Sequence, residues 1–164
     1  MPISALLLAA ATVAAVATPA PATVADPLAP ARKGLIECFQ PNEKAHICRA
    51  LSRYVENKDG SWQTTTTMLL LPNRPLTMET QYVARMEGNA VCSSLDKPTL
   101  DAAKLRVGGE PLPEDRVAMV HERLEMVLGA TLGKKECASY LDTGNGLLHH
   151  GTIDGQPTRA AMAK

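Results

Sequence analysis

The chain has 164 residues, of which 45% are hydrophobic and 21% are charged, and this composition is typical of a globular protein rather than a disordered one. Lysine plus arginine equals aspartate plus glutamate at 17 each, so the formal net charge is zero. This balance argues against a nucleic-acid binder and against a polybasic membrane-surface binder, because both need a clustered positive field. The length predicts a single domain.

Residues 1–25 are predicted to be a secretory signal peptide. They contain no charged side chain, and the apolar run 5–17 is shorter than the about 20 residues that span a bilayer. Small residues precede two candidate cleavage points, after Ala17 and after Ala25. No basic residue precedes the apolar run, so an uncleaved anchor and a buried helix stay open as alternatives. Residues 26–34 are predicted to form an Ala/Pro-rich linker.

The four cysteines fit an exported protein that forms disulfide bonds, because their number is even and all follow the predicted signal peptide. Four cysteines allow three pairings. Turn-forming residues between Cys38 and Cys48 favour that local bond, and Cys92 would then pair with Cys137. A structural zinc site is disfavoured, because zinc-binding cysteines usually occur in closely spaced pairs.

The first part of the domain is predicted to consist of antiparallel strands. Four segments with β-branched or alternating side chains are separated by turn signals: 47–55, 62–71, 76–86 and 90–95. A two-residue turn at Gly88-Asn89 would place Cys92 opposite Arg85, on the more polar face of that hairpin. That placement requires either a covering element or a bulge in the turn.

The clearest helix is predicted over 113–128. Proline and two acids suit its start, apolar side chains form one stripe along it, and Gly129 suits its end. Strands are predicted again over 136–141 and 147–153. The predicted fold class is therefore α+β, an antiparallel sheet of about five to seven strands in hairpins with one main helix packed on a face and stapled by disulfides. The single domain would span 35–155, followed by a flexible tail over 156–164.

Several motifs, spread over most of the chain after the signal peptide, resemble small exported proteins of Gram-negative bacteria that lack a characterised function. These motifs are Cys38, a gap of nine residues, Cys48 with the segment 49–54, Asp59-Gly60, the segment 67–72, Cys137, and Ile153-Asp154-Gly155. They are structural rather than chemical. The resemblance therefore implies export and disulfide bonds and no particular activity.

Residues that suggest catalysis or metal binding are few. Ser94 and Lys97 match a Ser-x-x-Lys pair, but Pro98 opposes the helix on which such a pair depends. His149 and His150 are adjacent on a predicted strand, so their side chains should point to opposite faces. One of them is therefore expected to be exposed and the other partly buried, without a shared metal ion.

The remaining candidates have structural explanations. His46 is expected to be exposed inside the smaller disulfide loop, and His121 is expected at the edge of the apolar helix stripe. Glu114 and Asp115 suit the positive start of the predicted helix. Asp154 lies in a turn that lacks the ligand spacing of a calcium loop. The sequence thus predicts no catalytic, cofactor-binding or metal-binding residue, and no cofactor.

Two classes of function remain. The first is an exported, non-enzymatic binding or interaction protein of the cell envelope, periplasmic or secreted, with an unknown protein partner, no nucleic acid and no stable membrane anchor after cleavage. The alternative is a small periplasmic hydrolase or metal-dependent enzyme with dispersed residues such as Tyr140, His149 and Asp154. A conserved polar cluster in a pocket would favour the enzyme, whereas an exposed apolar patch or an unpaired strand edge would favour the binding protein. The oligomeric state stays open.

Overall fold

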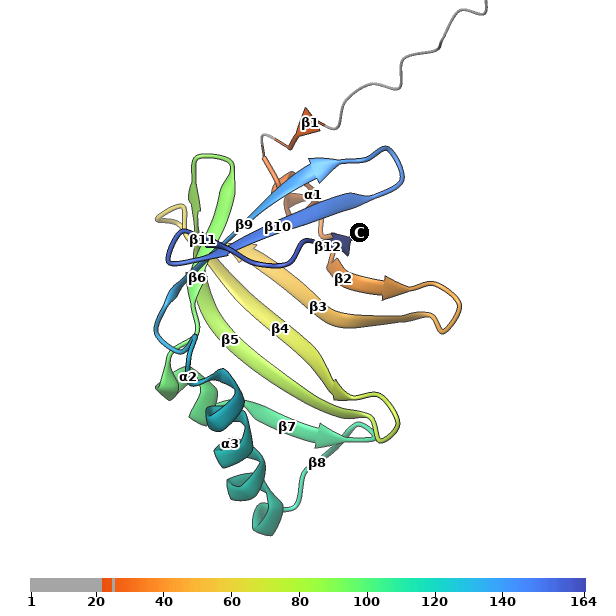
Figure 1. Ribbon diagram of the computed structural model, residues 1–164, viewed down its shortest axis with the longest axis vertical. Coiled ribbons are helices and arrows are strands. Elements are labelled where there is room, and N and C mark those ends of the chain that lie inside the picture. Colours follow the sequence, from red (N-terminus) through yellow and green to blue (C-terminus); the bar gives the residue numbers. More distant parts are fainter. Residues whose placement is uncertain (1–21, 25) are drawn as a thin grey trace, which may run out of the picture.

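The computed structural model describes residues 22–24 and 26–164, and its main feature is a closed antiparallel β-barrel (Figure 1). The barrel consists of β2 (Glu37–Asn42), β3 (Ile47–Glu56), β4 (Trp62–Leu71), β5 (Leu76–Glu87), β6 (Ala90–Ser94), β9 (Lys135–Asp142), β10 (Leu147–Ile153) and β12 (Ala161–Ala163). The other elements are β1 (Ala22–Thr23), α1 (Ala29–Arg32), α2 (Lys97–Asp101), β7 (Lys104–Val107), β8 (Glu110–Pro111), α3 (Glu114–Leu128) and β11 (Gln156–Pro157). The predicted signal peptide lies outside the described residues, except for 22–24.

The barrel closes through β6, which pairs with the strands at both ends of the main strand order. The strands follow the order β9-β10-β12-β2-β3-β4-β5, and β6 then pairs both β5 and β9. The predicted α+β class, with an open sheet covered by one helix, is therefore wrong, because the fold is mostly β and its helices are short accessories. Six of the eight barrel strands were predicted from local patterns, whereas β2 and β12 were not. The β6–β9 and β12–β2 contacts join segments that are far apart in the chain.

The interior of the barrel contains several buried polar side chains. Along β4, Thr64 and Thr66 are buried, and Thr80 is buried on the neighbouring β5. These residues share the side of the sheet with buried Met78 and Ala84, as the two-residue period of a strand requires. The threonine run that predicts a strand therefore also supplies part of the wall of the barrel.

The N-terminal segment before β2 closes one end of the barrel. Leu28, only 2% exposed, packs against Trp62, Ala84 and Val91. Arg32 of α1 lies over the Trp62 ring, 5.0 Å from its centre, and pairs with Glu56 at 3.0 Å. The segment 26–34, predicted to be a linker, is thus anchored to the barrel in the structure.

The C-terminal segment completes the wall. Ala163 of β12 is fully buried and pairs with β2, while the other edge of β12 pairs with β10. The Lys164 amide donates to the Cys38 carbonyl at 3.0 Å, and the Cys38 amide donates to the Lys164 carbonyl at 2.7 Å. The segment 156–164 was predicted to be a flexible tail. In the structure it contains a paired strand, whose backbone hydrogen bonds join β10 to β2.

A second core, which is apolar, lies beside the barrel and forms the helix-covered flank. The first half of β5 pairs with β7 rather than with β6, and α2 and α3 lie next to it (Figure 1). Its buried centre is Met78, Leu100, Ala103 and Leu105, and the apolar stripe of α3 packs on it through Val117, Val120, Leu124 and Leu128. The predicted helix and its predicted stripe are both present, but they cover this flank rather than the main sheet.

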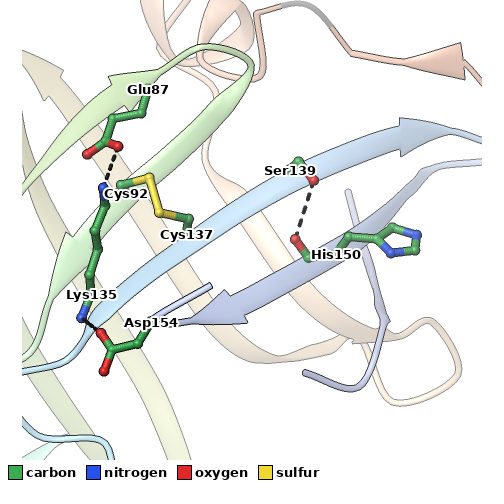
Figure 2. The surroundings of a disulfide bond; sticks show 7 residues. All are labelled: Glu87, Cys92, Lys135, Cys137, Ser139, His150 and Asp154. Carbon is green, nitrogen blue, oxygen red and sulfur yellow. Dashed lines mark hydrogen bonds and ion pairs between the residues drawn. A yellow bond between two sulfur atoms is a disulfide. The ribbon is translucent and has the colours of Figure 1, made fainter. Parts of the chain in front are cut away.

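Both disulfides join the cysteines that the sequence pairs, Cys38 with Cys48 and Cys92 with Cys137. Cys92 also lies opposite Arg85, as predicted, in a regular hairpin without a bulge. The second disulfide crosses between β6 and β9, where the barrel closes, so it covalently reinforces that seam (Figure 2). Two disulfides fit a protein from an oxidising, non-cytoplasmic compartment.

Candidate ligand-binding cavity

The barrel interior contains a half-open cavity of about 260 Å³, walled by side chains from β2, β3, β5, β6, β9 and β10 and by Thr158. This volume is close to the lower end of the range that small-molecule sites occupy. The alternation of strand side chains brings polar residues from opposite walls to the same space. The cavity is therefore the candidate functional site.

Glu37 lies at the centre of the main hydrogen-bond network. The Tyr54 hydroxyl donates to its Oε2 atom and the Tyr140 hydroxyl donates to its Oε1 atom, each at 2.7 Å. Burial, reinforced by the charge of Glu37, raises the pKa of both phenols well above the ordinary value. Both hydroxyls thus stay protonated near neutral pH and hold the carboxylate in one position.

A second network crosses three neighbouring strands. The Thr66 hydroxyl contacts the Tyr82 hydroxyl at 2.9 Å and the Ser52 hydroxyl at 3.0 Å. Burial also raises the pKa of Tyr82. This network satisfies buried polar groups without a charge, so it differs from the Glu37 network in its chemistry.

His149 lines the same cavity and pairs directly with Tyr140 across β9 and β10. Its ring meets the rings of Tyr140 and Phe39 edge-on, with centroid distances of 5.5 and 5.1 Å. Burial lowers the pKa of His149, and its Nδ1 atom is buried without a hydrogen-bond partner among the described residues. The neighbouring His150 is exposed, which confirms the prediction that the two histidines face opposite sides.

Glu136 supplies a second carboxylate to the cavity wall. Burial raises its pKa, and within the described part of the chain no side-chain or backbone donor hydrogen-bonds to its carboxylate. The charged residues of the lining are thus Glu37 and Glu136, and neither forms an ion pair with a lysine or arginine of the described residues. The cavity is an acidic, aromatic-walled site.

An apolar groove of about 400 Å³ adjoins the cavity at the N-terminal segment. Glu37, Tyr54 and Tyr140 line both spaces, so this triad forms the boundary between the two. Leu35 and Ile36 line the groove and remain largely exposed, at 59% and 42%. The arrangement places apolar surface directly beside the polar triad.

The Ser94–Lys97 match forms no catalytic pair. Lys97 begins α2 and its ammonium group contacts Asp101 and Glu125, both at 3.0 Å. Ser94 is exposed at the end of β6. Pro98 lies in the first turn of α2, so the short helix begins at the lysine and does not contain the serine.

Of the three residues proposed for an enzyme, the structure brings only two together. Tyr140 and His149 meet in the cavity, whereas the Asp154 carboxylate accepts a hydrogen bond at 3.0 Å from the backbone amide of Lys135 (Figure 2). Asp154 therefore organises the turn after β10, as the sequence suggests. Glu114 and Asp115 lie in the first turn of α3, also as expected.

The sequence did not single out the residues that define the cavity, namely Glu37, Tyr54, Tyr82 and Glu136. A signal was present, because three tyrosines of the chain occupy barrel strands at inward-facing positions. Without the barrel, however, nothing indicates that β2, β3, β5 and β9 enclose one space.

No protein-family model, no curated protein and no solved structure matches this chain. The resemblance to small exported proteins therefore stays a prediction. The geometry of the cavity is therefore the basis for assigning a function.

Proposed function

We propose that this protein is an exported binding protein that holds a small ligand inside its barrel. The observation that carries the proposal is the cavity itself, in which polar groups from six strands and aromatic rings converge on one space. Convergent polar groups within a concave, partly aromatic lining are the usual features of a small-molecule site. The binding role predicted from the sequence is kept, and its target becomes a small molecule instead of an envelope protein.

Export to the periplasm or the medium is part of this proposal. The two disulfides support an oxidising compartment. Among the described residues, no helix combines the length and apolarity needed to cross a bilayer. The apolar, uncharged residues 1–25 support a signal peptide as the route of export.

Binding is favoured over hydrolysis because the three tyrosine hydroxyls of the cavity and the Glu37 carboxylate are already engaged in hydrogen bonds within the fold. The Tyr140 hydroxyl donates to Glu37 and not to His149. The Nδ1 atom of His149 has no hydrogen-bond partner among the described residues, so no second group orients this ring as a general base. A polar cavity held rigid by its own hydrogen bonds suits recognition of a ligand.

The test is protein-observed NMR with a library of small molecules on the purified, oxidised protein. Binding inside the barrel is expected to shift backbone amide signals of the cavity-lining strands. The variant Ala138→Leu adds bulk to the cavity wall and should weaken binding, whereas Ala118→Leu, the same change on the exposed side of α3, should not. Shifts confined to the outer surface, or equal binding by a folded Ala138→Leu variant, would overturn the proposal.

A further inference from the structure

Given the proposed function, on which this inference rests, we infer that the ligand is a small organic cation, an ammonium group attached to an apolar framework. The charge and the hydrogen-bond pattern of the cavity define which class of compound can bind in it.

The charge of the cavity is the first observation. Its two carboxylates, Glu37 and Glu136, form no ion pair with the lysines and arginines of the described residues, although many carboxylates on the outer surface do. Glu79, for example, pairs with Lys104 at 3.1 Å. A half-buried carboxylate without a cation carries a desolvation cost, and a cationic ligand would supply the missing partner.

The two carboxylates would contribute in different ways. Glu136 accepts no hydrogen bond from the described residues, so it is free to pair with an ammonium group. Glu37 is already held by two phenols, but each carboxylate oxygen has a further lone pair that can accept a ligand N–H. The cavity thus offers one unpaired and one pre-positioned anionic acceptor.

The neutral groups also favour a donor-rich cation. The hydroxyls of Tyr54 and Tyr140 donate to Glu37, so they are not available to an anionic ligand. His149 adds the buried Nδ1 atom, which can accept a hydrogen bond when the ring is neutral. An anion would therefore face two carboxylates with few free donors.

The aromatic rings of the cavity also favour a cationic ligand. Phe39, Tyr54, Tyr82 and Tyr140 line the cavity, and aromatic faces attract ammonium groups at short range. The apolar groove beyond Glu37 could hold an apolar part of the same ligand, because the two spaces share the Glu37–Tyr54–Tyr140 boundary. An amine with an aromatic or aliphatic framework fits both compartments.

The test compares probes that share a framework and differ in charge. NMR titrations at pH 7 would use 2-phenylethylamine, 2-phenylethanol and phenylacetate, and then butylamine, 1-butanol and butyrate. Each amine should shift the signals of the cavity strands and bind at least about tenfold tighter than its alcohol, with the acid weakest. Glu136→Gln should remove most of that preference, while Glu122→Gln, on the exposed face of α3, should retain it.

Two results would overturn the inference. If the alcohols or acids bind in the cavity as tightly as the amines, the ligand class is wrong while the proposed function stands. If no amine shifts the NMR signals of the cavity strands, an organic cation is also the wrong ligand class. In that case the proposed function fails as well only if no compound of the broader library binds inside the barrel.

Discussion

The barrel interior and the helix-covered flank are built on the same strand, β5, yet they have opposite chemistry. Met78, near the start of β5, lies in a core of leucines and alanine. Tyr82, four residues later on the same side, lines a cavity with threonine, serine and glutamate side chains. One strand thus passes from a dry core into a polar cavity within two side-chain repeats.

This contrast indicates a division of roles. A dry apolar core stabilises a fold through burial, whereas enclosed polar groups contribute little net stability and carry a cost when unpaired. The flank should therefore supply a large part of the stability, and the cavity should supply the binding. Substitutions that change stability and binding separately therefore test this division of roles.

The most destabilising substitution is expected on the flank, at Leu100. This side chain is fully buried, so Leu100→Ala should lower the free energy of unfolding by about 3–5 kcal/mol through lost burial and an unfilled cavity. Urea unfolding would measure the loss. Affinity for a cavity ligand, measured on the folded fraction, should stay within about twofold. A large change in affinity would show that the two regions are coupled.

The two disulfides are expected to contribute unequally. Cys92 and Cys137 are 45 residues apart in the chain, whereas Cys38 and Cys48 are 10 apart. The chain-entropy relation assigns about 4 kcal/mol to the longer loop and about 3 kcal/mol to the shorter one. Paired Cys→Ser variants, compared by urea unfolding, should keep this order. A reversed order would show that the β6–β9 seam depends little on its covalent bond.

A smaller effect is expected inside the cavity when one phenol is removed. Tyr140→Phe deletes a hydrogen bond to the Glu37 carboxylate and should cost about 1–3 kcal/mol of stability. Tyr82→Phe is the matched control, because its hydroxyl contacts only the neutral Thr66 hydroxyl, and it should cost about 1 kcal/mol. Equal losses in urea unfolding would mean that Glu37 does not depend on its phenol donors.

The sequence predicted most of the barrel strands and the main helix, but it did not predict the cavity. Strand β5 and helix α3 were placed to within a residue or so, because alternation and the helical stripe are local signals. β12 was missed because its residues, Ala161–Ala163, have little strand preference and form a strand only between β10 and β2. The cavity depends on that closure, so residues such as Glu37 could not be recognised from local pattern.

The weakest effect on stability is expected at Glu136, whose carboxylate also links stability to binding. Burial raises the pKa of this carboxyl above its ordinary value of 4.5, so the folded protein binds its proton more tightly than the unfolded chain does. The stabilising contribution of the protonated group is complete below pH 4.5 and is lost as the pH rises through the raised pKa. Glu136→Gln removes this loss and should stabilise the free protein at pH 7 only slightly, because solvent screens the part of the carboxylate that remains exposed.

The difference between the wild type and Glu136→Gln should therefore shrink as the pH falls toward 4.5. His149, whose pKa is lowered by burial, makes both proteins less stable as the pH falls below 6.5, and this common contribution cancels in the difference. Urea unfolding across this pH range would measure both trends. At saturating 2-phenylethylamine the order should reverse, because the ammonium group pairs with Glu136 in the wild type alone. If the free variant is less stable than the free wild type, Glu136 forms a stabilising interaction within the fold. Its carboxylate is then not available to pair with a cation.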